Sequence, residues 1–198
     1  LRGLLMGYGI VIDKSLHKLR QRLPEILEDA ENGLSSLARE IFAEMRDELM
    51  HLDQLIAQAD KKVSAMASAH EACRRLMEIP GIWPISATAY VAVIGDGNQF
   101  KNGRQCAAYL GLTPKQHSSG GRETLLGITK RGHPYMRTLL VHGARASLTA
   151  ARKRQGTDEL SRTDAWALAL AEKRHTNVAV VALVVHAESY VINCVSIY

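Results

Sequence analysis

The sequence predicts an all-α protein in which a long coiled-coil helix precedes a compact helical domain. Aromatic residues make up 5% of the 198 residues, which argues against a β-sandwich, and the 46% of apolar residues suffice for a buried core. Residues 34–78 contain neither glycine nor proline, and their apolar residues recur at helical spacing.

The glycine-free segment 34–78 has the apolar pattern of a coiled coil. After Leu49 the apolar positions alternate steps of three and four, which is a heptad seam, and the steps of four before it form a stutter. The seam consists of Leu37, Ile41, Met45, Leu49, Leu52, Ile56, Ala59, Val63 and Met66. A continuous helix of this length would reach roughly 65 Å and needs a partner along its side. That partner is either a second copy of the chain, which we favour, or a helical hairpin within one chain.

A Pro-Gly turn follows the coiled coil. Pro80 and Gly81 break the helix, and Pro84 begins a new one. Two helices joined by such a turn resemble a helix-hairpin-helix element, whose turn faces a phosphate. Trp83 stands where that motif usually has a second glycine, and a bulky residue tolerates a positive φ poorly. Gly81 is therefore either a nucleic-acid contact or part of a structural corner.

Shorter helices are expected to complete the helical domain. One is predicted from Arg104 to Leu110, another from Pro134 to about Arg152, and a third from about Thr163 to Leu183. Between the first two, Gly120 and Gly121 reverse the chain within a loop.

The charge is concentrated in one segment. Residues 101–154 hold 11 lysines and arginines against one acid, so this segment carries +10, while the whole chain has a net charge of +5. Such an asymmetry is typical of a protein that binds a polyanion, and nucleic acid is the first candidate. A membrane surface would need a bulky amphipathic helix, which this glycine-rich segment does not provide.

Cysteine and histidine patterns exclude other classes of site. The three cysteines lie far apart without a CxxC pair, and the eight histidines form no metal-binding pair, so we predict no metal bound by this chain alone. A reducing cytoplasm is the expected compartment. The longest clean apolar run, residues 178–185, is too short to span a bilayer.

Four motifs together resemble a known family. They are IPGIWPISATAYVAVIGD, LGLTPKQHSSGG, GITKRGHPYMRTLLVHGARA and KRHTNVAVVAL. In this order and spacing they resemble bacterial insertion-sequence transposases of the IS110/IS116/IS902 class, the bridge-RNA-guided recombinases, over residues 1–183. After Leu183 the sequence departs from the family pattern, as a frameshift or a remnant gene copy would produce.

The resemblance implies a division into four parts. Residues 1–33 would be the end of an acidic RNase-H-like domain with linker helices, 34–78 the coiled coil, 79–183 the DNA-binding and strand-transfer domain, and 184–198 a divergent tail. The family's four acidic Mg²⁺ ligands would lie upstream of this sequence, so no cofactor is expected in this chain alone. The expected partners are DNA, a structured bridge RNA, and further copies in a dimer or tetramer.

The resemblance also implies a nucleophilic serine that attacks a DNA phosphate. The family's serine directly precedes a glycine, which assigns the role to Ser119, with Ser118 as the alternate. His117 is either a base for that serine or an ordinary surface histidine. The cations expected to contact nucleic acid, together with Gly81, are Lys101, Arg104, Arg122, Lys130, Arg131, Arg137 and Arg145.

Three functions remain open at this point. The first is DNA transposition and recombination, with this chain supplying DNA binding and the serine. The second is a catalytically dead fragment that binds nucleic acid, which the absence of the acidic ligands would favour for this sequence in isolation. The third is a helix-hairpin-helix accessory protein of DNA repair.

Overall fold

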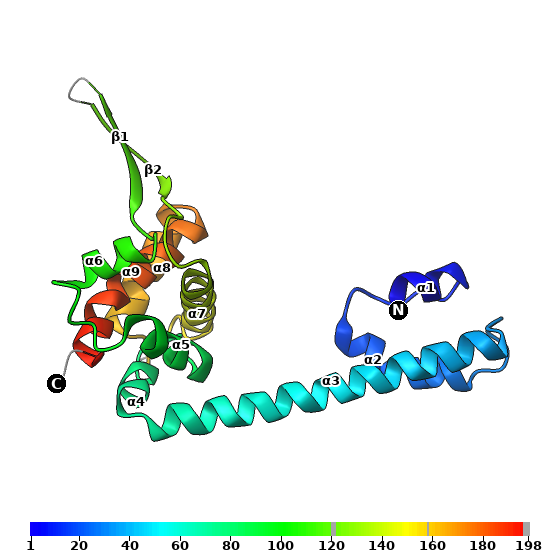
Figure 1. The fold of residues 1–198 in the computed structure, drawn as a ribbon. Coiled ribbons are helices and arrows are strands. Elements are labelled where there is room, and N and C mark those ends of the chain that lie inside the picture. The colour runs from blue at the N-terminus through cyan, green and yellow to red at the C-terminus, as the bar shows by residue number, and fades with distance from the viewer. Residues whose placement is uncertain (120–121, 158, 196–198) are drawn as a thin grey trace. The chain divides into compact units, whose positions relative to one another are not determined.

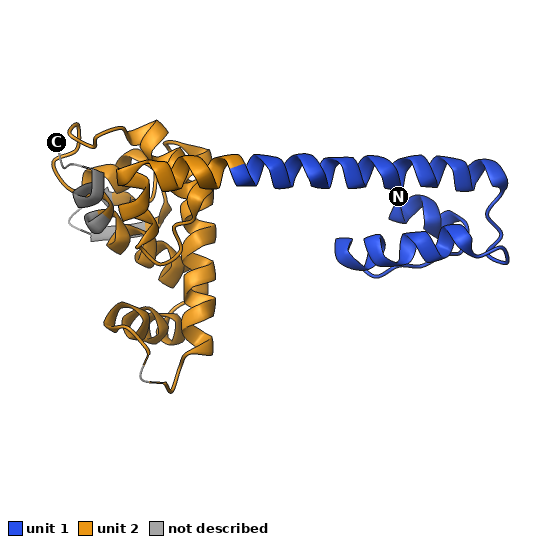
Figure 2. Cartoon of the chain, turned by 90° about the horizontal axis from the view of Figure 1, so that it is seen from below, with its two compact units in different colours: residues 1–61 blue, residues 62–198 orange. Residues whose placement is uncertain are grey.

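The computed structural model describes residues 1–119, 122–157 and 159–195, with the backbone alone described at 118–119, 122–125, 189–190 and 192–195. The described residues form helices and one two-stranded antiparallel sheet (Figure 1). They divide into two compact units, Leu1–Lys61 and Lys62–Tyr198 (Figure 2). None of the described helices is long and apolar enough to cross a membrane.

The first unit is built from α1 (Arg2–Gly7), α2 (Leu16–Glu28) and the start of α3 (Ser36–Ala69). Its buried core joins Leu19 and Leu23 of α2 to Phe42 of α3. Outside this core, the Arg20 guanidinium donates two hydrogen bonds to the Asp53 carboxylate, at 2.7 and 2.6 Å. Helix α2 therefore packs on α3 as a helical hairpin, which was one of the two arrangements left open for the coiled-coil segment.

The predicted seam uses a different face of α3. Leu37 is 66% exposed, Ile56 58% and Met66 64%, whereas Ala38 and Phe42 are buried. The hairpin thus covers one side of α3 and leaves most of the seam exposed, whereas Leu49 and Val63 are half-buried. Pairing of the seam with a second copy stays a prediction.

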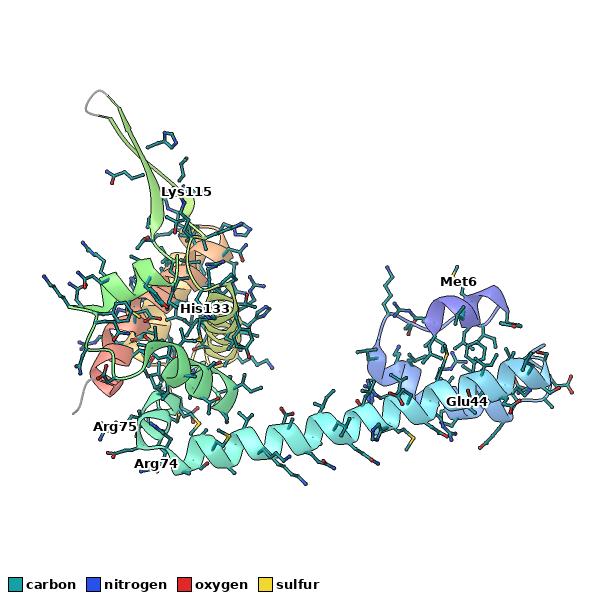
Figure 3. All side chains as sticks on the ribbon, viewed as in Figure 1. Met6, Glu44, Arg74, Arg75, Lys115 and His133 are labelled. Atoms are coloured by element: carbon teal, nitrogen blue, oxygen red, sulfur yellow. The ribbon has the colours of Figure 1, made fainter. Side chains whose placement is uncertain are left out.

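The prediction of one unbroken helix from 34 to 78 is wrong. Helix α3 ends at Ala69, and α4 (Glu71–Met77) follows after His70, whose backbone is extended. The Arg74 guanidinium stabilises this break, since it donates to the carbonyls of Ser68 and Ala69 at 2.9 and 3.3 Å (Figure 3). Residues on both sides of the break, Ala67, Cys73 and Leu76, are buried in the core of the second unit. The break therefore depends on tertiary packing, and no glycine or proline in the sequence indicates it.

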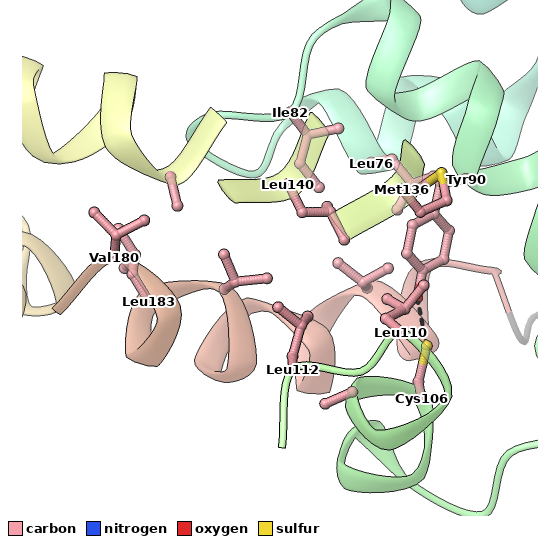
Figure 4. Close-up of a cluster of buried hydrophobic side chains, with 14 of the residues drawn as sticks. Leu76, Ile82, Tyr90, Cys106, Leu110, Leu112, Met136, Leu140, Val180 and Leu183 are labelled. Atoms are coloured by element: carbon pink, nitrogen blue, oxygen red, sulfur yellow. Dashed lines mark hydrogen bonds between the residues drawn. The ribbon is translucent and has the colours of Figure 1, made fainter. Parts of the chain in front are cut away.

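Helices α4 to α9 form the helical body of the second unit. They comprise α4, α5 (Pro84–Ile94), α6 (Gly103–Tyr109), α7 (Pro134–Lys153), α8 (Arg162–Lys173) and α9 (Thr176–Val195). Helix α9 contacts α4, α6, α7 and α8, so it is the central element of this body. Leu110, Met136 and, on α9 itself, Val180 are among the fully buried side chains of this core (Figure 4). The prediction of a single helix from Thr163 to Leu183 is wrong. The backbone is extended at Arg174, which separates α8 from α9.

A polar group lies inside this apolar core. The Tyr90 hydroxyl donates to Glu188 Oε2 at 2.8 Å and lies 3.0 Å from Cys106 Sγ, and Glu188 is fully buried. Burial raises the pKa of Glu188 to about 7, and burial together with the nearby carboxylate raises the pKa of Cys106 as well. The other carboxylate oxygen, Glu188 Oε1, has no hydrogen-bond partner among the described residues.

The prediction of an all-α chain is wrong for one segment. Strand β1 (Pro114–Ser119) pairs with β2 (Arg122–Ile128) in an antiparallel hairpin that extends away from the helical body (Figure 1). The sequence PKQHSS of β1 lacks the alternation of apolar and polar residues that usually identifies a strand. A ribbon with no buried face does not need that alternation, so the signal was absent.

Candidate nucleic-acid interface

The hairpin presents the predicted nucleophile at its far end. Ser119 is the last residue of β1 and pairs with Arg122, the first residue of β2. Gly120 and Gly121, predicted to reverse the chain between them, lie outside the described residues, as do the side chains of Ser118, Ser119 and Arg122. At these positions the structure describes the backbone register of the two strands.

The register separates the two serines. Successive residues of a strand fall on opposite faces, and cross-strand partners share a face. His117, Ser119 and Arg122 consequently belong to one face of the ribbon, and Ser118 belongs to the other with its partner Glu123. The face of Ser119 thus contains a cationic residue and a histidine, whereas the face of Ser118 contains an acidic residue.

The base of the hairpin is a close crossing of two backbone segments. Gly111 has φ +71°, and a Cβ there would lie 2.2 Å from the Arg131 carbonyl oxygen. Gly132 has φ +137°, and a Cβ there would lie 2.1 Å from the Tyr109 carbonyl oxygen. Real Cβ atoms do not approach backbone so closely, so both positions need glycine. The two glycines let the chain leave α6 and return to α7 side by side.

Hydrogen bonds strengthen this crossing. The Lys130 N–H donates to Gly111 O at 3.1 Å, and the Thr129 N–H donates to Thr113 O at 2.9 Å. The Arg137 guanidinium, from α7, donates to Leu110 O at 3.0 Å. Arg137 was predicted as a nucleic-acid contact, and the structure gives at least one of its donors a structural partner. The hairpin is therefore attached to the helical body by the main-chain crossing and by the side chain of Arg137.

A cavity of about 410 Å³ lies at the base of the hairpin. Its lining includes Lys115, His117 and Arg131, and Figure 3 shows Lys115 at this end of β1. No acidic residue among those described lines it. Among the described side chains, neither Lys115 nor Arg131 forms an ion pair, so both positive charges remain available to an anion.

The other predicted cations lie on several elements. Lys101 and Arg104 are exposed at the start of α6, and Lys130 is exposed beside the hairpin base. Arg145, on α7, is exposed and donates to Asn177 Oδ1 at 3.0 Å. The structure brings Arg131 to the hairpin cavity and Lys130 beside the hairpin base, whereas Arg145 belongs to the contact between α7 and α9.

The Pro-Gly turn packs against the helical body. Gly81 has φ +92°, and a Cβ there would lie 2.5 Å from the Gly143 carbonyl oxygen of α7. Trp83 has φ −107°, an ordinary extended value. The strain that the sequence predicted for a bulky residue at this position is therefore absent. The contact with Gly143 gives Gly81 a packing role, and its role in nucleic-acid binding stays a prediction.

Comparison with known proteins identifies the family. A model described as the transposase IS116/IS110/IS902 family matches residues 73–159, a segment that contains the hairpin and most of the positive charge. The chain belongs to this transposase family.

Curated relatives extend the similarity beyond the matched segment. The chain is 40% identical over 183 residues to a transposase for insertion sequence element IS1111A of Coxiella burnetii, covering 92% of this chain and 49% of that protein. It is also 40% identical to a probable family 20 transposase of Pseudomonas aeruginosa, over 92% of this chain and 53% of that protein. A putative transposase of Sinorhizobium fredii is 35% identical, over 92% and 46%. The chain spans about half the length of these curated relatives.

The described residues of this transposase chain do not fit the family's implied metal. They contain no group of three or more histidines, cysteines, aspartates or glutamates that could hold an ion. Hard cations such as Mg²⁺ require converging oxygen ligands. No step of the chemistry is therefore assigned to a metal bound by these residues.

Lys115 is a candidate interface residue that the sequence alone did not single out. It lies within the cation-rich segment and precedes the Ser-Ser-Gly-Gly stretch, for which the sequence predicts a loop. Only the hairpin brings it to the same cavity as Arg131, 16 positions later in the chain. A strand assignment for residues 114–119 would have suggested this pairing.

Proposed function

We propose that this chain is the DNA-binding and strand-transfer portion of an insertion-sequence transposase, with Ser119 as the nucleophile. In the proposed step the Ser119 oxygen bonds to a DNA phosphorus, and the bond from that phosphorus to one bridging oxygen of the strand breaks. The serine proton passes to a base, and the leaving oxygen takes up a proton from that base or from water, so that the cleaved strand has a free hydroxyl end. The phosphoserine link conserves the energy of the broken bond, so that a second hydroxyl can rejoin the strand and release the serine.

The observation that carries this proposal is the register of the hairpin. Phosphoryl transfer depends mainly on positioning the phosphate and neutralising its charge. The face of Ser119 includes the cation Arg122 and the histidine His117, which is a candidate base. The face of Ser118 includes Glu123, whose charge would repel a phosphate. The register therefore supports Ser119 over Ser118.

The cations at the hairpin base support binding of the DNA backbone. Lys115 and Arg131 line one cavity without acidic partners among the described residues, and Lys130 is exposed beside them. Contacts of this kind position a duplex without reading its sequence. Lys101, Arg104 and Gly81 are proposed as further contacts to the same backbone.

Other partners belong to the same proposal. A structured bridge RNA would direct target choice, and dimers or tetramers would assemble in the cytoplasm through the exposed seam of α3. The exposed side chains of Leu37, Ile56 and Met66 support the assembly, since a row of apolar residues on a helix usually has a partner. Any Mg²⁺ would be held by an acidic domain outside this sequence.

A second function applies to this chain acting alone. The described residues lack a metal-binding cluster, whereas residues 101–154 hold 11 lysines and arginines that can contact nucleic acid. By itself the chain is then expected to bind nucleic acid without cutting it, and to compete with a complete transposase for DNA. This function differs from the first only in the chemistry at Ser119.

The test joins this chain to the RNase-H-like domain of a full-length relative and supplies Mg²⁺, guide RNA and labelled DNA. A denaturing gel then detects DNA covalently linked to protein. Ser119→Ala is expected to abolish the adduct and to leave DNA binding nearly intact, because a single hydroxyl is removed.

Ser118→Ala is the matched control and is expected to keep the adduct. Loss of the adduct in Ser118→Ala alone would move the nucleophile by one position. An adduct that survives both changes would show that the hairpin serines are not the nucleophile. The isolated chain, with no added domain, is expected to bind the same DNA and to form no adduct.

A further inference from the structure

Helix α7 has an exposed face that the hairpin interface does not use. Its buried face includes Met136, Leu140 and Leu148, which pack into the helical body. On the exposed side, positions three, four and seven residues apart carry Thr138, His142, Arg145, Thr149 and Arg152. The 20-residue helix contains no acidic residue. This face is therefore a stripe of neutral and cationic side chains.

The start of α9 and the end of α8 extend this stripe. Arg145 Nη2 donates to Asn177 Oδ1 at 3.0 Å, and Arg152 Nη2 donates to Thr176 Oγ1 at 3.3 Å. Lys173 and Arg174 immediately precede this point of contact and are exposed. These hydrogen bonds bring cations from two distant parts of the sequence to one surface. We name it the α7–α9 surface, defined by His142, Arg145, Arg152, Lys173 and Arg174.

The partners of the two arginines are neutral. A carboxylate would cancel the charge of a guanidinium, whereas an amide or hydroxyl oxygen orients it and leaves the charge in place. A guanidinium has five N–H donors, so each arginine keeps donors for a ligand after bonding to Asn177 or Thr176. Holding the side chain in advance also reduces the entropy lost on binding.

The two acids of α8 do not neutralise this surface. Asp164 is paired with Arg154 at 3.1 Å. Glu172 adjoins Lys173 in the sequence, but none of the ion pairs among the described side chains involves it. The α7–α9 surface thus has four lysines and arginines against one exposed acid on α8, Glu172, which leaves a net positive patch.

We propose that the α7–α9 surface is a second binding site for a nucleic-acid phosphodiester backbone, separate from the hairpin interface. This inference rests on the proposed function and deepens it, because it gives the domain two backbone contacts instead of one. The ligand is a duplex, whose regular row of phosphates matches a row of cations along a helix and into the next one. DNA and RNA share this chemistry, and the experiment compares them.

The test measures duplex affinity against salt concentration for the chain as it exists. The double variant Lys173→Gln with Arg174→Gln removes two charges from exposed side chains that form no ion pair among the described residues, so folding should be unaffected. The slope of log affinity against log salt is expected to fall by about 1.8, or about 0.9 for each lost phosphate contact on B-DNA. Parallel titrations use a DNA duplex and an RNA duplex of the same sequence, and the larger change identifies the ligand.

Lys61→Gln with Lys62→Gln is the matched control, because it removes the same charge from the exposed side of α3. An equal fall in slope for this control would overturn the inference, since net charge alone would then explain the result. An unchanged slope for the Lys173 and Arg174 variant would also overturn it. The hairpin variant Lys130→Ala with Arg131→Ala tests the proposed function separately: a fall there alone retains the hairpin interface and rejects the α7–α9 surface.

A crosslinking measurement places the contact directly. A photoreactive amino acid at position 142, in the exposed stripe, is expected to crosslink to the duplex when both neighbouring arginines are intact. Arg145→Gln with Arg152→Gln should reduce this crosslink at least severalfold, with the melting temperature recorded to verify folding. A crosslink at position 142 that is absent, or that is insensitive to both arginines, contradicts the inference.

Discussion

The helical body and the hairpin of the second unit are held in place by different forces. The body, α4 to α9, buries a continuous apolar core around α9. The hairpin extends from it and depends on main-chain crossings at Gly111 and Gly132 and on the Arg137 hydrogen bond. The apolar core and the predicted nucleophile therefore lie in separate parts of this unit, so that substitutions in the two regions should have different consequences.

The largest effect is expected at the contact of α7 with the Pro-Gly turn. Gly143→Ala would put a Cβ 1.9 Å from the Gly81 carbonyl oxygen, so two backbone segments must separate. Overpacking of this kind costs about 3 kcal/mol or somewhat more. The melting temperature should fall by about 6–12 °C. Gly127→Ala is the matched control in the hairpin, where a Cβ meets nothing within 4 Å, and it should leave melting almost unchanged.

The buried Glu188 makes the stability of the helical body depend on pH. Because burial raises its pKa from 4.5 in the unfolded chain to about 7, the folded state favours the protonated form. The contribution of protonated Glu188 to the free energy of unfolding is fully present below pH 4.5. It is lost as the pH rises through 7, by up to about 3 kcal/mol. Thermal melting between about pH 5 and about pH 8.5 should show a falling midpoint.

Glu188→Gln tests this assignment, since the amide keeps an acceptor for the Tyr90 hydroxyl and cannot ionise. The variant should have a nearly flat melting midpoint over the same range. A wild-type midpoint that rises with pH, or a variant that keeps the wild-type dependence, would assign the effect to other groups. Salt dependence of DNA binding should not change in this variant, because Glu188 lies in the core and not in the interface.

The seam of α3 should affect assembly far more than folding. Leu52 and Ile56 are 44% and 58% exposed, so Leu52→Asp with Ile56→Asp should change the unfolding free energy by about 0.5 kcal/mol or less per site. Analytical ultracentrifugation should nevertheless show monomers, because charges in a seam prevent helix pairing. Gln54→Asp with Gln58→Asp adds the same charge on α3 outside the seam and should keep the oligomer. Wild-type protein that is monomeric at tens of micromolar would contradict the predicted pairing.

The smallest effect on stability is expected for the cations beside the hairpin base. Lys130→Ala with Arg131→Ala alters two exposed side chains without ion pairs among the described residues, so melting should be unchanged. The salt slope of duplex binding should fall by about 1.8, equally for all sequences. A loss confined to particular sequences would show instead that these residues read bases.

Local sequence determined much of the helical body and the location of its charge. Pro84 and the pair His133-Pro134 begin helices in the structure as predicted, because proline fits the first turn and His133 Nδ1 accepts from the Met136 N–H. The excess of cations in residues 101–154 is a property of composition, and this segment lies within residues 73–159, which the family model matches. These features depend on a residue and its near neighbours.

Tertiary structure decided the rest, for reasons that the linear pattern does not contain. The break at His70 follows from burial of residues on both sides of it, and the hairpin forms without an apolar face to reveal it. The crossings of Gly111 with Arg131 and of Gly81 with Gly143 join positions 20 and 62 residues apart. The cavity that unites Lys115 with Arg131, and the neutral partners that orient Arg145 and Arg152, exist only once these distant segments meet. Contacts between such segments depend on the path of the whole chain, and for that reason local spacing did not predict them.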